Sequence, residues 1–387
     1  MGLNFKKNIL PFIISISIGI ILTEITLWVF FPIDDPYEKY KTDKHLTFRF
    51  IDSQFQPHQN FVFYCEKELS GMQDSARFST NNYGYRGDEL IEPKPENEFR
   101  IFMVGGSTTE CLFLDDSLAV TYLMQNKLNE LIDTNKKIKV YNAGKSGDKT
   151  YDHIAMISHR ILHLEPDMII IFSGINDLAA AIYNKDYTHP QVYDIVPKLN
   201  LKNLFRYALT EFQVHRRIYY TFQPLFYQQS EETIQMAIAY KSDYKHLVAM
   251  KKKHPVSDIR PRTDLHSYRL NLETIIAMAQ IHNVDLVFMT QATTWNSKID
   301  PKTYDWNWIT YKNKVHYKEE YMDQALETYN NELKDLAATY NIPIYNLAAE
   351  IPKSLEYFYD DCHFNVKGSY FASARLAEFM AQNCQIP

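Results

Sequence analysis

Four short polar segments of the sequence carry side chains that could do nucleophilic or acid–base chemistry. They are residues 105–109 (GGSTT), 142–148 (NAGKSGD), 174–177 (GIND) and 360–363 (DDCH). A serine hydroxyl is a good nucleophile only when a neighbouring base takes its proton, and histidine with aspartate is the usual combination. Each segment alone also fits a structural role, such as a phosphate-binding turn or a helix cap. Together, and in this order, they favour a catalytic site.

The first three segments each follow a short apolar run that predicts a buried strand. These runs are residues 100–104, 138–141 and 168–172, and similar runs at 284–290 and 344–345 predict a fourth and a fifth strand. Continuous apolar runs are typical of parallel strands that are covered on both faces.

Helical stretches alternate with these strands, at residues 116–133, 150–163, 264–282, 318–340 and 366–382. Such alternation predicts an α/β fold, a three-layer α/β/α sandwich with a central parallel sheet. Sites in these sheets lie at the carboxyl ends of the strands, so we expect the polar segments to converge on one crevice.

The order of the segments resembles the SGNH/GDSL hydrolase family, over roughly residues 80–385. In that family the nucleophile lies in a GDS or GGS loop after the first strand, and later blocks supply a Gly, an Asn and a DxxH pair. The matching positions are Ser107, Gly147, Asn176, Asp360 and His363. The segment 83–87 (YGYRG) is also similar to a stretch that precedes the serine block in many members. One departure is Gly106, where the name-giving motif has Asp.

The resemblance implies a flavodoxin-like SGNH fold and a role for each matched residue. Ser107 is expected to be the nucleophile and His363 its base, since imidazole titrates near neutral pH. Asp360 is expected to hold the ring tautomer and stabilise the imidazolium. The backbone N–H groups of Ser107 and Gly147 and the side-chain amide of Asn176 would form the oxyanion hole.

Other polar residues of these segments have competing interpretations. Asp361 is the alternative partner for His363, although it lies two residues before the histidine rather than three. Asp148 and Asp177 are expected to buttress their loops rather than react. A bystander role is expected for Cys362.

The cysteine pattern does not predict a metal site. The four cysteines are Cys65, Cys111, Cys362 and Cys384, with no CxxC spacing, and the sequence has no HExxH motif. Free buried thiols are the favoured state, while the sequence leaves any disulfide pairing open. We predict neither a metal nor another cofactor.

The amino-terminal region predicts a transmembrane helix over residues 9–31, a run whose only charge is Glu24. Two lysines precede the run and two aspartates follow it, so the positive-inside rule places residues 1–8 in the cytoplasm. The protein is then single-pass, with its catalytic domain periplasmic or at the cell surface. A cleaved signal peptide is the alternative, but no small-residue cleavage site follows the run.

The rest of the chain divides by composition. Residues 32–98 are expected to be a spacer and amino-terminal extension, and 99–385 the SGNH hydrolase-like domain. Within it, residues 178–263 are rich in Tyr, Phe, His and Lys, with no clear strand. They indicate a largely helical insertion that covers the site, or else a surface elaboration. The net charge of -6 gives no basic excess, so no nucleic-acid partner is expected.

These features together predict an extracytoplasmic serine hydrolase that cleaves carboxyl esters through an acyl-Ser107 intermediate. By resemblance, the substrate is an O-acylated glycan, an envelope polymer or a lipid. An O-acyltransferase would use the same triad, so it remains an alternative. A non-catalytic envelope scaffold protein is a third interpretation, against which the intact set of matched residues argues.

Overall fold

The computed structural model describes residues 5–33, 55–65, 69–183, 251–312 and 314–386, with short pieces at 209, 212–218, 221, 234–235 and 249. Most of the predicted insertion 178–263 and part of the predicted spacer therefore lie outside the described residues. The chain divides into two compact units, Met1–Phe50 with Val192–Ser230, and Ile51–Gln191 with Glu231–Pro387. The domain boundaries drawn from the sequence stay a prediction.

The smaller unit contains helix α1 (Phe5–Phe30), whose stretch Pro11–Phe30 is long and apolar enough to cross a membrane. Glu24 accepts hydrogen bonds from the backbone N–H groups of Gln213 and Val214, the latter over 3.0 Å. The guanidinium of Arg216 donates to the carbonyl oxygen of Ile33 over 2.8 Å. The lone charge of the apolar run is therefore bound by the chain itself.

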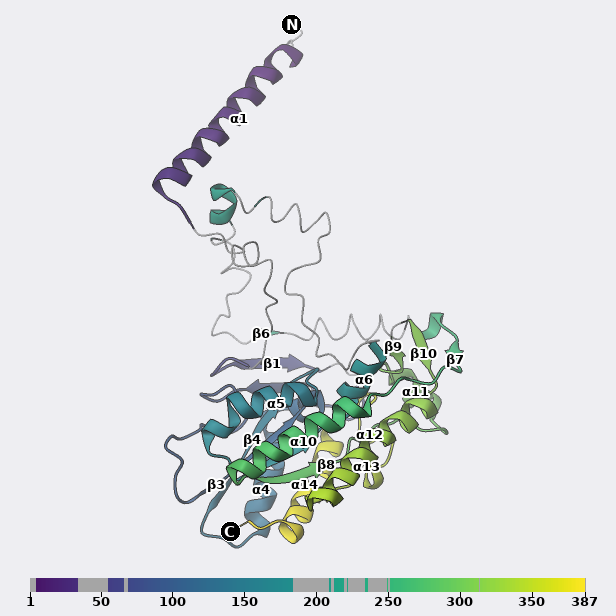
Figure 1. The fold of residues 1–387 in the computed structure, drawn as a ribbon. Coiled ribbons are helices and arrows are strands. Elements are labelled where there is room, and N and C mark those ends of the chain that lie inside the picture. The colour runs from purple at the N-terminus through teal and green to yellow at the C-terminus, as the bar shows by residue number, and fades with distance from the viewer. Residues whose placement is uncertain are drawn as a thin grey trace. The chain divides into compact units, whose positions relative to one another are not determined.

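The larger unit is built on a five-stranded sheet in the order β11-β8-β5-β3-β4. Figure 1 labels β3, β4 and β8 of this sheet. Every neighbouring pair in it is parallel. The strands are β3 (Glu98–Gly105), β4 (Lys137–Gly144), β5 (Met168–Phe172), β8 (Asp285–Met289) and β11 (Ile344–Tyr345). The predicted strands and the predicted α/β/α fold with a central parallel sheet are confirmed.

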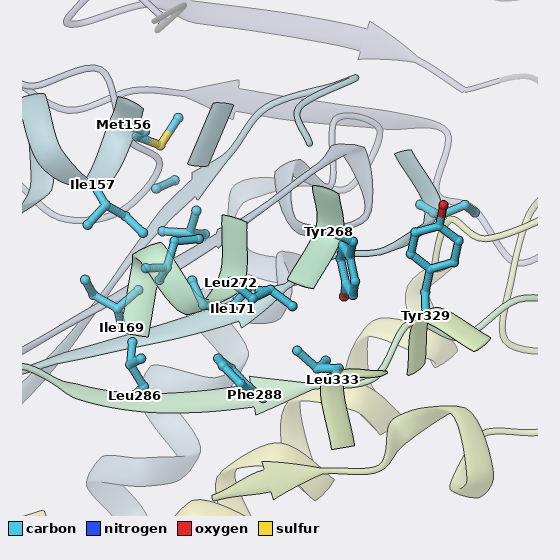
Figure 2. Close-up of a cluster of buried hydrophobic side chains, with 14 of the residues drawn as sticks. Met156, Ile157, Ile169, Ile171, Tyr268, Leu272, Leu286, Phe288, Tyr329 and Leu333 are labelled. Carbon is cyan, nitrogen blue, oxygen red and sulfur yellow. The ribbon is translucent and has the colours of Figure 1, made fainter. Parts of the chain in front are cut away.

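Alternate residues of the central strands enter two different hydrophobic cores. Phe102 and Ile171 pack in the core with α5 (Thr150–His159), α6 (Ile175–Tyr183), α10 (Leu265–His282) and α12 (Glu319–Tyr340). Figure 2 shows part of this core, which contains Met156, Leu272 and Leu333 from the helices and Ile169 and Phe288 from the sheet. Each such side chain contributes roughly 1.5–3 kcal/mol when fully buried.

The opposite face of the sheet is covered by three helices. Ile101 and Ile170 pack there with α4 (Val120–Leu131), α13 (Leu347–Glu350) and α14 (Val366–Asn383). The alternation follows from the strand period of two, which sends successive side chains to opposite faces. The helices predicted between the strands are all present. The one predicted at 116–133 begins with a separate 3₁₀ turn, η1 (Asp116–Leu118), and the one predicted at 150–163 ends with another, η2 (Ile161–Leu164).

Two small three-stranded sheets were not predicted. The first joins β1 (Asn60–Tyr64), β2 (Ser75–Ser79) and β6 (Ile234–Gln235), and the second joins β7 (Val256–Ser257), β9 (Tyr311–Lys312) and β10 (Val315–Tyr317). The expectation of no strand in residues 178–263 is wrong at β6 and β7. Two-residue strands exist through pairing alone, so they leave no periodic pattern in the sequence.

Candidate active site

Ser107 lies at the turn between the central strand β3 and the short helix α3 (Ser107–Glu110). The preceding Gly106 packs directly on the side chain of Asn176. A Cβ added at Gly106 would lie 2.4 Å from Asn176 Nδ2 and 3.5 Å from the carbonyl oxygen of Asp148. The departure from the name-giving motif at Gly106 therefore allows a close approach between the serine turn and the third polar segment.

Ser107, His363 and Asp360 form a continuous chain of hydrogen bonds. His363 Nε2 lies 2.8 Å from Ser107 Oγ, and His363 Nδ1 lies 2.8 Å from Asp360 Oδ2. A carboxylate can only accept, so Nδ1 carries the proton and Nε2 accepts the serine hydroxyl. Asp360 is fully buried, while 13% of the His363 side chain is exposed. The ring of Tyr359 stacks on the imidazole at 5.4 Å and 11°.

Asp361, the alternative partner for the histidine, points into a different environment. Its Oδ2 accepts the indole N–H of Trp295 over 2.8 Å, and its Oδ1 accepts the backbone N–H of Trp308 over 2.6 Å. The backbone N–H of Ile309 donates to both oxygens. The structure thus brings Asp360, rather than Asp361, to the imidazole ring.

The loop 144–148, which contains Gly147, is tied to the serine turn. The backbone N–H of Lys145 donates to the Gly105 carbonyl over 3.0 Å, and the Ser146 hydroxyl donates to the Glu110 carboxylate. Gly147 has a φ of +84°, in the left-handed region that favours glycine, and the space a Cβ would occupy is open.

Asn176 lies between these two segments at the start of α6. Its Nδ2 donates to the carbonyl oxygen of Asp148 over 2.9 Å, which fixes the amide beside Gly106. The next residue, Asp177, accepts hydrogen bonds from the backbone N–H and hydroxyl of Thr150 at the start of α5. A buttressing contact therefore exists for Asp177, as its position in the motif led us to expect.

Comparison with known proteins adds an independent observation to this geometry. Residues 103–370 match the model of the GDSL-like lipase/acylhydrolase family. The chain belongs to this family. The membership supports esterase or acylhydrolase activity in general terms. A comparison with curated protein sequences finds no significant match.

Solved structures of GDSL-like acylhydrolases are similar to this chain at low sequence identity. A putative lipolytic protein of the G-D-S-L family from Desulfitobacterium hafniense is 9% identical, with 73% of this chain and 99% of that chain covered and a TM-score of 0.39. A lipase/acylhydrolase from Enterococcus faecalis is 14% identical, with 74% and 100% covered and a TM-score of 0.41. An acetylxylan esterase from Geobacillus stearothermophilus is also 14% identical, with 73% and 93% covered and a TM-score of 0.40.

The two adjacent aspartates of this GDSL-like protein have pKa values that are shifted in opposite directions. Burial opposes charge on Asp360, but the neighbouring His363 outweighs it, so the pKa of Asp360 is lowered. Burial, reinforced by repulsion from Asp360, raises the pKa of Asp361 to about 7. For the imidazole, burial is outweighed by the Asp360 carboxylate, which raises the pKa of His363 well above its ordinary value.

Arg86 holds the far end of helix α3, a role that the sequence did not reveal. Its guanidinium donates to the carbonyl oxygens of Glu110 and Cys111, each over 2.8 Å, and to the carboxylate of Asp116. It also lies 4.4 Å from the centre of the Phe78 ring. The similarity of segment 83–87 to the family was the available signal, because that segment contains this arginine.

The cysteines are all free thiols, two buried and two half-buried. Within the described residues, Asp360, Cys362 and His363 form a group whose ligand atoms lie within 4.8 Å of one another. A metal would need the thiolate, but burial raises the pKa of the Cys362 thiol to about 11. The histidine nitrogens already bind Asp360 and Ser107, so the group is better suited to proton transfer than to metal binding.

The raised pKa of His363 sets the expected pH dependence of ester hydrolysis. If His363 is the base, it must be neutral to accept the serine proton. We therefore expect kcat/KM to rise with pH through the His363 pKa, so the acid limb of the pH profile should lie above about pH 6.5. Initial rates on a short-chain aryl ester across pH measure this limb.

A second group near the site requires a control. Burial and the nearby Asp152 raise the pKa of Asp148 to about 8. The Asp148→Asn variant should therefore keep the acid limb of the wild type. A limb that disappears in this variant would assign the titration to Asp148 and contradict the role of His363.

Proposed function

We propose that this protein is an extracytoplasmic serine esterase that cleaves carboxyl esters through an acyl-Ser107 intermediate. The observation that carries the proposal is the hydrogen-bonded chain from Ser107 Oγ through His363 to Asp360. Family membership supports acylhydrolase chemistry of this general kind.

In the first step, Ser107 Oγ attacks the ester carbonyl carbon while His363 Nε2 takes the hydroxyl proton. The imidazolium that forms lies against the buried Asp360 carboxylate, which stabilises its charge. His363 then gives the proton to the leaving alcohol oxygen as the carbon–oxygen bond breaks. In the second step, water attacks the acyl-serine carbonyl carbon while His363 Nε2 takes a proton from it. His363 then returns that proton to Ser107 Oγ as the bond between Oγ and the acyl carbon breaks, and the acid is released.

The oxyanion formed at each step needs fixed hydrogen-bond donors. We assign them to the backbone N–H groups of Ser107 and Gly147 and to the side chain of Asn176. The N–H of a first helical residue has no partner within its helix, so that of Ser107 can serve. One N–H of the Asn176 amide binds Asp148, which leaves the second for the substrate.

The proposed substrate is an O-acylated glycan, an envelope polymer or a lipid. Helix α1 supports this assignment, because a membrane anchor would hold the enzyme beside the polymers and lipids of the cell envelope. The partly exposed His363 is compatible with access by a bulky ester.

The triad is tested by substituting each member and its closest neighbour. Ser107→Ala and His363→Ala should abolish turnover of an aryl ester, and Ser107→Ala should also abolish labelling by a fluorophosphonate. Asp360→Asn should lower kcat by on the order of 10³–10⁴, because the imidazole loses its orienting carboxylate.

Asp361→Asn is the matched control for Asp360→Asn, since the two carboxylates are adjacent and equally buried. We expect this variant to lower the melting temperature, because it weakens hydrogen bonds that hold the fold together. It should lower kcat by no more than about 10-fold, because those hydrogen bonds do not involve Ser107 or His363. Equal losses of kcat in the two variants would show that the orienting residue is assigned wrongly.

The oxyanion hole is tested at Asn176. Asn176→Ala should lower kcat by on the order of 100-fold or more with KM nearly unchanged, because the donor acts mainly on the transition state. The control is Asn271→Ala, which removes an amide donor to Thr150 on the neighbouring α5 and should leave kcat close to the wild-type value. A large rise in KM with kcat preserved would make Asn176 a substrate-binding residue instead.

The location is tested by protease accessibility of the full chain in spheroplasts of an expressing bacterium. We expect added protease to digest the catalytic domain in intact spheroplasts, because the positive-inside rule places it outside. A cytoplasmic protein in the same cells should survive until lysis. Protection of the catalytic domain before lysis would contradict the proposed topology.

A further inference from the structure

Two consecutive aspartates, Asp360 and Asp361, bind the same tryptophan. Asp361 Oδ1 accepts the backbone N–H of Trp308 over 2.6 Å. Asp360 Oδ2 accepts the indole Nε1–H of Trp308 over 3.1 Å. The backbone of Trp308 is therefore held by one carboxylate, while its indole donates to the other, which also binds His363.

The loop that carries Trp308 is fixed by a buried polar network. The side chain of the fully buried Asn307 accepts from the Thr294 hydroxyl over 2.7 Å and donates to Glu319 over 2.8 Å. Lys251 Nζ donates to the Asn307 carbonyl over 2.9 Å and forms a buried ion pair with Glu319 at 3.2 Å. A donor whose backbone is held in this way needs little reorganisation to reach its acceptor.

The ring of Trp308 is also fixed by cation–π contact. Lys312 Nζ lies 4.7 Å from the Trp308 ring centre and 5.1 Å from that of Tyr183, at the end of α6. The half-buried indole is thus held both at its face and at its N–H.

We propose that Trp308 is a positioning residue for the catalytic base, whose indole N–H fixes the Asp360 carboxylate so that Asp360 keeps His363 turned toward Ser107. The inference rests on the proposed function of the triad. Asp360 Oδ1 accepts the backbone N–H groups of Cys362 and His363, over 3.1 and 2.9 Å. The indole supplies a side-chain donor to Oδ2, so both oxygens are held while the carboxylate binds the imidazole.

Trp308 is not titratable, but several titratable groups surround the Asp360–His363 pair. The Cys362 thiol lies 3.7 Å from His363 Nδ1, and Tyr359 stacks on the imidazole. The charge of Glu110 acts on His363, and Asp361 is adjacent in the chain. Substitutions at Trp308 keep all of these groups, so a changed pH profile reports the lost donor.

The test uses two variants of the full chain that separate the donor from the ring. Trp308→Phe keeps an aromatic ring and removes the N–H, whereas Trp308→Gln keeps an N–H donor and removes the ring. In Trp308→Phe we expect kcat on the aryl ester to fall by on the order of 10-fold or more, the value for a hydrogen bond to a charged group. KM should stay unchanged, and the acid limb should move to higher pH, because Asp360 without its donor holds the imidazolium more strongly.

Trp308→Gln should retain more of the wild-type kcat than Trp308→Phe, with its acid limb near that of the wild type. Rates are referred to the active sites titrated with a fluorophosphonate, so an unfolded fraction does not enter the comparison. If Trp308→Phe yields no folded protein, the inference is tested by Trp308→Gln alone. An acid limb that shifts in Trp308→Gln would overturn the inference.

The comparison variant is Trp295→Phe, which removes an indole donor from Asp361 instead of Asp360. It should lower the melting temperature and leave the acid limb in place. If both Trp308 variants lose kcat equally and keep the wild-type acid limb, Trp308 acts through packing alone and the inference is overturned. If Ser107→Ala kept wild-type turnover, the proposed function itself would fail. If Ser107→Ala is inactive but Trp308→Phe has the wild-type kcat and acid limb, only the inference about Trp308 is overturned.

Discussion

The buried negative charge of Asp360 is the constraint on which the candidate site depends. An ionised carboxylate without exposure is costly unless donors surround it. Here the donors come from its own loop, from the imidazole of His363 and from the indole of Trp308. Because these bonds are made together, the position of His363 is coupled to the position of the Trp308 loop, 52 residues before Asp360 in the chain.

The contrast with Asp361 shows that environment, rather than residue type, separates the two carboxylates. Both are fully buried, yet the pKa of Asp360 is lowered and that of Asp361 is raised. The difference is the cationic partner, since Asp360 faces His363 while Asp361 faces indole and amide donors and its own charged neighbour. One aspartate can therefore stay ionised beside the imidazole while the other ties the Trp308 loop to the fold.

The parallel sheet explains why distant segments meet. The loops that contain Ser107, Gly147 and Asn176 follow β3, β4 and β5, which are neighbours in the sheet. All the strand pairs of this five-stranded sheet are parallel, so these loops emerge at one edge, where the Lys145 and Asn176 hydrogen bonds tie them together. The contact of Gly106 with Asn176 sets the distance between the first and third loops.

The sequence predicted the central sheet well because its signal is local. Residues 168–172 are continuously apolar, which is typical of a buried parallel strand. The helices between the strands were predicted from the alternation of helical stretches with such runs. The meeting of Ser107 with His363 was also expected, from the strand-end rule and the family resemblance. Trp308 was missed because its contacts lie with Asp360 and Asp361, far along the chain, and no local pattern encodes them. The strands β1 and β2 were missed although Phe61 and Phe63 alternate with polar or less buried positions, because five residues give a weak period.

The 256 residues that separate Ser107 from His363 have a consequence for the order in which the protein matures. During synthesis the serine turn and the central strands leave the ribosome long before the histidine loop does, so a growing chain holds the proposed nucleophile without its proposed base. Closing so long a loop is also entropically costly, and contacts of this kind form late. If the proposed triad is correct, hydrolytic activity arises only when the carboxyl-terminal loop docks, and on refolding its recovery should trail the return of helical structure.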